Sequence, residues 1–168
     1  VQLLDISGPS YMRTARNKVP RMYDDQSKLR LKIGVGSILE EGGDVAIIAC
    51  GVMVELAREA SSTLANEGVD CTVVDMHTIK PLDTEIISML AERCGCFVSA
   101  EDHSVIGGLG SAVSEWISTN NPVPLEMVGV RDRFGESGST SRLMEEVGLT
   151  SESICQAVRK SINRKNSS

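Results

Sequence analysis

Apolar residues along this chain gather in short continuous runs that alternate with amphipathic stretches. Continuous runs are typical of strands buried on both faces of a sheet, and amphipathic stretches with a period near 3.6 residues are typical of helices. The runs predict strands at 33–39, 45–50, 71–76, 97–100 and 123–130. The amphipathic stretches predict helices at 53–67, after an N-cap at Asp83, at 109–118 and at 151–163.

Strands and helices that alternate in this way predict an α/β domain with a mostly parallel sheet and helices on both of its faces. The first 31 residues do not follow the alternation. Residues 8–16 predict a strand entered through a Gly-Pro turn, and residues 18–32 are polar and predict a linker. A lone strand is only marginally stable in water, so we expect its partner strands to lie outside this chain.

Composition narrows the classes of protein that the chain can belong to. Aromatic residues make up 3% of the chain, so we expect a core of aliphatic side chains, as is usual for a parallel sheet covered by helices. The net charge of −6 argues against a nucleic-acid-binding surface. No apolar run is long enough to predict a membrane span. The five cysteines show no CxxC pair and no histidine at metal-ligand spacing, so we expect no metal site, and the odd count favours reduced thiols in the cytoplasm.

A polar cluster and a glycine-rich turn follow the predicted strand at 97–100, where ligands bind in open α/β sheets. The residues concerned are Glu101, Asp102, His103, Gly107, Gly108 and Gly110. The polar cluster could supply a general acid and base, but spacing identifies no nucleophile beside it, and we favour a hydrogen-bonded cluster that holds a loop. The glycines resemble a dinucleotide fingerprint only in part. Close packing of a loop or a partner chain is the better interpretation.

Two arginines, Arg13 and Arg16, flank the end of the first predicted strand. The planar guanidinium group can bind a phosphate or a carboxylate with two hydrogen bonds, although a solvated surface arginine is the simpler interpretation. The residues alone therefore predict a cytoplasmic α/β domain that lacks a partner.

Four motifs, in order along the chain, resemble the C-terminal part of the transketolase family of thiamine-diphosphate enzymes. They are Gly8-Pro9-Ser10 with Arg13 and Arg16, the segment 75–83 that ends in Lys-Pro-Leu-Asp, the segment 101–113 with its glutamate and glycines, and Asp132-Arg-Phe134 followed by 138–149. The resemblance implies a three-layer αβα fold with a five-stranded, mostly parallel sheet, whose one antiparallel strand corresponds to 33–39. It also implies three sections: residues 1–17 as the last strand of a pyrimidine-binding domain, 18–32 as a linker, and 33–165 as the C-terminal domain.

The resemblance also carries implications for chemistry. Thiamine diphosphate and Mg²⁺ would be bound in the complete enzyme by an N-terminal subunit or domain, in a homodimer or heterotetramer, and not by this chain alone. Arg16 stands where the family places an arginine that binds the substrate phosphate, whereas no residue of this chain matches a catalytic position. We expect the loop at 101–110 to lie at an interface or beside the site.

Within the family, the first expectation is a transketolase that transfers a ketol unit between sugar phosphates, with this chain as the C-terminal subunit of a split enzyme. A 1-deoxy-D-xylulose-5-phosphate synthase and the beta subunit of a 2-oxo acid dehydrogenase are alternatives. A non-catalytic assembly or regulatory module is the alternative from another class.

Overall fold

The computed structural model describes residues 2–15, 23 and 31–167. The strands are β1 (Ser37–Glu40), β2 (Val45–Ala49), β3 (Cys71–Asp75), β4 (Phe97–Ser104) and β5 (Leu125–Val130). The helices are the 3-10 helix η1 (Gln2–Asp5) and the α-helices α1 (Met53–Ala65), α2 (Thr84–Cys94), α3 (Leu109–Asn120), α4 (Thr140–Glu146) and α5 (Ser151–Asn166).

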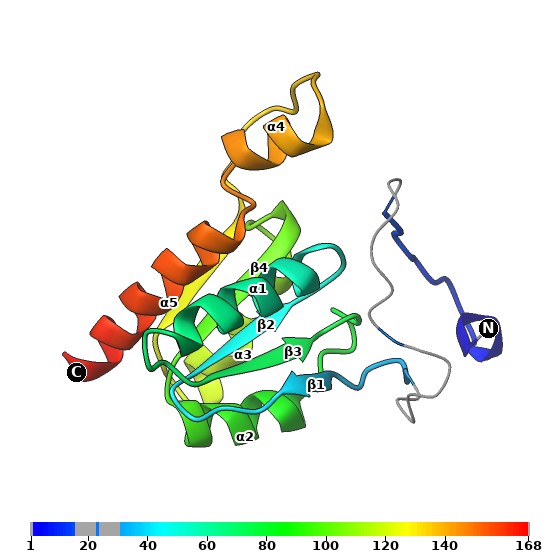
Figure 1. Ribbon diagram of the computed structural model, residues 1–168. Coiled ribbons are helices and arrows are strands. Elements are labelled where there is room, and N and C mark those ends of the chain that lie inside the picture. The colour runs from blue at the N-terminus through cyan, green and yellow to red at the C-terminus, as the bar shows by residue number, and fades with distance from the viewer. Residues whose placement is uncertain (1, 16–22, 24–30, 168) are drawn as a thin grey trace.

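The strands form one sheet in the order β1-β3-β2-β4-β5. Figure 1 shows helices on both sides of this sheet. β1 pairs antiparallel to β3, and the other neighbouring strands are parallel. The predicted fold class, a three-layer αβα domain with one antiparallel strand, is confirmed. The antiparallel strand also falls within the expected region, although it begins at Ser37 rather than at residue 33.

Alternate residues of the central strands enter two separate cores. Val45, Ile47 and Ala49 of β2 pack with α1 and α5, whereas Ala46 and Ile48 pack with α2 and α3. All five side chains are fully buried. Because successive strand residues point to opposite faces, a strand covered on both sides must be apolar at every position, which explains the continuous runs.

Local features end the elements where the sequence indicates. The Asp83 side chain accepts a hydrogen bond of 3.1 Å from the backbone N–H of Ile86, which confirms the predicted N-cap of α2. Gly95 ends the same helix with a φ of 67°, a left-handed conformation that a residue without Cβ adopts at little cost.

Three features differ from the sequence predictions. β4 continues to Ser104, so Glu101 and Asp102 lie in a strand and not in a loop. The short helix α4 was not predicted, and it has no buried residue to produce an apolar pattern. The strand predicted at 8–16 is not formed by the described residues 9–15, since a strand needs a neighbour with which to hydrogen-bond.

The assignment of 1–17, 18–32 and 33–165 to three sections remains a prediction. In the part of the chain that the structure describes, no helix has the length and apolar character that crossing a membrane requires.

Candidate functional site

The carboxyl ends of β2, β3 and β4 form the candidate site of the domain. β2 lies between the other two strands, and α1 covers one face of the sheet while α2 and α3 cover the other. Ligands bind to open α/β sheets at such a point, where successive connections leave toward opposite faces. The titratable side chains at this edge include Cys50 after β2, Asp75 in β3, and Glu101, Asp102 and His103 in β4.

Glu101 is fully buried and binds the beginning of α3. Its carboxylate accepts hydrogen bonds from the backbone N–H groups of Leu109, at 2.7 Å, and Gly110, at 2.8 Å. The ring of His103 lies with Nδ1 3.8 Å from Oε2 of the same carboxylate. A carboxylate at a helix N-terminus satisfies N–H groups that have no partner within the helix and interacts favourably with the helix dipole. Glu101 therefore acts as the cap of α3, and the arrangement suits a hydrogen-bonded cluster that holds a loop.

The three glycines of the turn each meet a different geometric demand. Gly107 has a φ of +75°, where side chains are strained. A Cβ on Gly108 would overlap the Glu101 carboxylate and lie 2.7 Å from the carbonyl oxygen of Ser104. A Cβ on Gly110 would lie 2.6 Å from Oγ of Ser99.

These glycines permit close packing within the chain. The two N–H groups that a bound phosphate would need at the beginning of α3 are already occupied by Glu101. The hydrogen bonding therefore argues against a dinucleotide site at this turn.

Asp102 and His103 lie at the surface instead of in a closed active site. The side chain of Asp102 is 47% exposed, and its Oδ2 lies 3.0 Å from the Arg13 guanidinium. The His103 side chain is 51% exposed, and its Nδ1 lies 2.8 Å from the carbonyl oxygen of its neighbour Ser104.

Cys50 is the thiol nearest to this cluster, and its environment suppresses the thiolate. Burial first, and then the charges of Glu101 and Asp75, raise its pKa to about 12, although Arg13 acts to lower it. A thiol with this pKa stays protonated at neutral pH, so Cys50 does not supply the nucleophile that the sequence analysis lacked.

Asp75 is a buried carboxylate that the sequence analysis did not single out as a site residue. Its Oδ2 accepts a hydrogen bond of 2.5 Å from the Tyr23 hydroxyl. Its Oδ1 is buried and has no hydrogen-bond partner among the described residues. Burial and the neighbouring Asp75 raise the pKa of Tyr23. An acidic residue that ends an otherwise apolar strand run was the available signal in the sequence.

Arg16, the predicted phosphate-binding residue, lies outside the described residues. Its role in binding a phosphate therefore stays a prediction. Among the described residues, no group of three or more His, Cys, Asp or Glu side chains is arranged to hold a metal ion.

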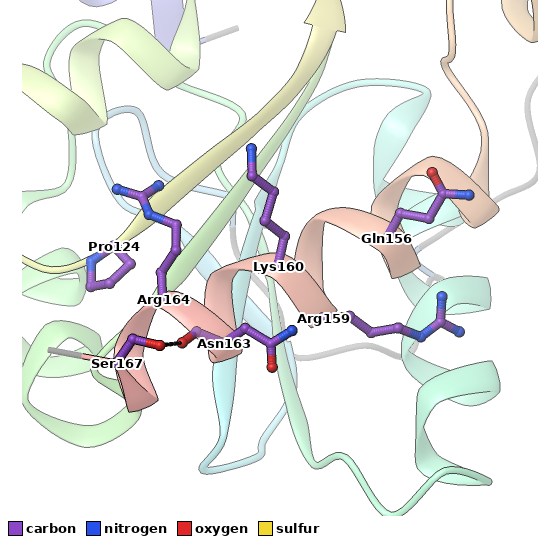
Figure 2. A pocket seen from close by; sticks show the side chains of 7 residues that line it. All are labelled: Pro124, Gln156, Arg159, Lys160, Asn163, Arg164 and Ser167. Carbon is purple, nitrogen blue, oxygen red and sulfur yellow. Dashed lines mark hydrogen bonds between the residues drawn. The ribbon is translucent and has the colours of Figure 1, made fainter.

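Two surface hollows lie away from the centre of this edge. The first, of about 630 Å³, follows the exposed face of α5 (Figure 2) and is lined by Pro124, Gln156, Arg159, Lys160, Asn163, Arg164 and Ser167. Its cations form ion pairs: Arg159 with Glu67 at 2.6 Å, and both Lys160 and Arg164 with Glu126 at 2.8 Å. This pairing offsets most of the positive charge of the groove, so the groove is poorly suited to an anion.

The second hollow, of about 530 Å³, borders the glycine turn. Its lining includes Gly107, Gly108, Ile79, Leu82 and Trp116. The outer side of the turn therefore faces a partly apolar depression, the kind of surface that proteins use for contact with other proteins.

Comparison with known proteins agrees with the fold. The family model "Transketolase, C-terminal domain" matches residues 34–154. The chain is 45% identical over 165 residues to the 6-deoxy-6-sulfo-D-fructose transketolase subunit SqwH of Clostridium sp. (strain MSTE9). This alignment covers 98% of this chain and 51% of that protein. The chain is 40% identical over 152 residues to 1-deoxy-D-xylulose-5-phosphate synthase 1 of Geobacter sulfurreducens, covering 89% of this chain and 24% of that protein.

A solved structure described as "Split gene transketolase, inactive beta4 tetramer" superposes with a TM-score of 0.93 and 43% sequence identity. The match covers 98% of this chain and 53% of that one. The chain thus spans about half the length of the first of these relatives and of the solved structure.

Proposed function

The chain belongs to the transketolase family, as a C-terminal part, and on this premise we propose that it serves in a split transketolase that transfers a two-carbon ketol unit between sugar phosphates. The observation that carries the proposal is the 45% identity over 98% of the chain to a transketolase subunit, together with the structural match to a split transketolase. Its five free cysteines suit the reducing cytoplasm that we propose as its location.

Thiamine diphosphate and Mg²⁺ would supply the chemistry that forms and breaks the carbon–carbon bond, and the described residues do not fit them. The glycine-rich helix N-terminus of α3 is filled by the Glu101 carboxylate, and no described cluster of His, Cys, Asp or Glu side chains is arranged for a metal ion. We therefore assign cofactor binding to a separate N-terminal subunit or domain.

The proposed partner is this N-terminal cofactor-binding subunit, in a heterotetramer or, if both parts form one polypeptide, in a homodimer. The segment 101–110, with its turn between β4 and α3, and the depression beside it are the proposed contact surface on this chain. Ile106 in this turn is 65% exposed, and Ile79, which lines the depression, is 39% exposed. The related solved structure is described as an inactive tetramer, which suits a chain that needs a different partner for activity.

Mixing the two subunits tests this function. We expect no ketol transfer from xylulose 5-phosphate with this chain alone, and turnover on addition of the N-terminal subunit, thiamine diphosphate and Mg²⁺. Stable binding without turnover on any ketose donor would instead support an assembly module. Formation of 1-deoxyxylulose 5-phosphate would support the synthase, which the similarity to the Geobacter enzyme keeps as a second candidate.

Arg16 remains the proposed residue for the anionic end of the substrate. In the assembled enzyme, Arg16→Ala should raise the KM for a phosphorylated ketose by about 10- to 100-fold, because a hydrogen bond to a charged group contributes about 1.5–3 kcal/mol. Arg58→Ala is the control, since Arg58 pairs with Glu40 on the surface. An unchanged KM in Arg16→Ala would remove this role. The named substrate of SqwH makes the 6-sulfo ketose a second donor to compare.

A further inference from the structure

The described N-terminal residues cross the carboxyl edge of the sheet. We call residues 2–15 together with Tyr23 the N-terminal arm. At its beginning, the Gln2 side chain donates to the carbonyl oxygen of Leu31 at 2.7 Å and accepts from the N–H of Ile33 at 3.0 Å. Leu31 and Ile33 precede β1, which runs antiparallel to β3. β1 therefore begins at the edge of the sheet where β2, β3 and β4 end.

The arm makes two further contacts along the same edge. The Tyr23 hydroxyl donates to Asp75 at the end of β3, as described above. The Arg13 guanidinium donates to both the backbone carbonyl oxygen and Oδ2 of Asp102 in β4. In the strand order β1-β3-β2-β4, the contacts thus fall on the segment before β1 and at the ends of β3 and β4, on both sides of the end of β2. Figure 1 shows the arm beside the side of the sheet toward which β2 and β3 point.

We propose that the carboxyl edge of this sheet is the docking site of the chain's own N-terminal arm, with Asp75 and Asp102 as the residues that hold it. Asp75 is 7% exposed, and among the described residues the hydrogen bond that its Oδ2 accepts comes from the Tyr23 hydroxyl. Asp102 accepts two hydrogen bonds from Nη2 of Arg13, one at its backbone carbonyl oxygen and one at Oδ2, so it binds the guanidinium at two points. The position that binds ligands in other open α/β folds is thereby used for an intramolecular contact. This inference goes beyond the proposed function and does not depend on it.

Cys50 provides a local reporter of this docking. It follows β2, between the contacts at Asp75 and Asp102, and it is the one partly exposed cysteine, since the other four are buried. Release of the arm should make its thiol more accessible to a reagent. Among the charges around Cys50, Arg13 lowers the pKa of the thiol, whereas Glu101, Asp75 and Asp102 raise it.

These opposite charges make the experiment decisive. Arg13→Gln removes a lowering influence on the Cys50 pKa and Asp102→Asn removes a raising one, so electrostatics alone would slow labelling in the first variant and speed it in the second. Loss of docking would speed labelling in both variants. Tyr23→Phe removes one hydrogen-bonding oxygen without changing any charge at neutral pH and gives an independent third measurement.

The test is the rate at which the Cys50 peptide is modified by iodoacetamide in the full chain, followed by mass spectrometry at constant pH. We expect all three variants to react about threefold faster or more than the parent protein, the effect of losing about 0.6 kcal/mol or more of docking free energy. Arg58→Gln, which breaks a surface ion pair with Glu40, is the matched control and should leave the rate unchanged.

Opposite changes in Arg13→Gln and Asp102→Asn, or unchanged rates in all three variants, would overturn the proposal. Labelling of the buried Cys71 identifies any variant that has unfolded. The mildest change, Tyr23→Phe, then decides between docking and its absence.

Discussion

Replacing Gly108 with alanine tests whether Glu101 caps α3 as the structure indicates. A methyl group at this position would overlap Oε2 of Glu101 and lie 2.7 Å both from its Cδ and from the carbonyl oxygen of Ser104. The backbone on one side cannot move away easily, so the carboxylate must leave its place. It would then lose the hydrogen bonds from Leu109 and Gly110 while still inside the protein.

The size of the effect follows from these contacts. A hydrogen bond to a charged group contributes about 1.5–3 kcal/mol, and leaving a buried charge without its partner costs about 3–5 kcal/mol. We therefore expect Gly108→Ala to lower the free energy of unfolding by about 3–5 kcal/mol. For a chain of this length the corresponding decrease in Tm is about 10 °C.

Urea unfolding followed by circular dichroism measures the change, and Gly43→Ala is the matched control. A Cβ on Gly43 meets no atom within 4 Å, and its φ lies outside the left-handed region, so its replacement should change the free energy of unfolding by less than about 1 kcal/mol. If the two variants were equally stable, Glu101 would have room to move and the capping argument would be wrong.

Two further predictions concern stability. Burial raises the pKa of Glu126, but the hydrogen bonds and the charges of Lys160 and Arg164 together lower it more, so the net pKa lies below the ordinary value. A carboxyl with a lowered pKa stabilises the folded state at a pH above its unfolded pKa, and this stabilisation is lost as the pH falls through its folded pKa. Glu126→Gln should therefore have a lower Tm than the parent protein at pH 7 in calorimetric scans, and the difference between the two proteins should disappear toward pH 3. A difference that persisted at low pH would show that packing, not charge, is responsible. The two phenylalanines should differ sharply in urea unfolding: Phe97→Ala, at a fully buried position, should cost about 3–5 kcal/mol, and Phe134→Ala, at a position 97% exposed, less than about 0.5 kcal/mol. Equal costs would contradict the burial that the structure assigns.

Much of the fold could be predicted because its elements carry local patterns. The runs at 45–50 and 71–76 correspond to β2 and β3 within one residue at each end, and the N-cap at Asp83 is confirmed. Helix α4 escaped prediction because it buries none of its residues, and periodicity reports burial.

The roles at the candidate site were harder to predict, since they depend on which strands become neighbours. The sequence placed Glu101 beside glycines, but it could not show that its carboxylate reaches forward to the N–H groups of α3 and so closes that helix to phosphate. In the same way, Asp75 looked like the end of a strand. Its contact with Tyr23, which is 52 residues away in the sequence, exists only because the N-terminal arm lies along the carboxyl ends of the strands, where β3 ends at Asp75.

The sequence by itself determined the class of fold and the alternation of strands and helices, because burial on two faces and turn chemistry leave their marks on consecutive residues. It also indicated the family, through the resemblance of four motifs that lie in order along the chain. Only the tertiary structure decided what the carboxyl edge of the sheet holds. Hydrogen bonds such as those of Asp75 and Asp102 join residues that are 52 and 89 positions apart, and no local pattern of residues records such a pairing.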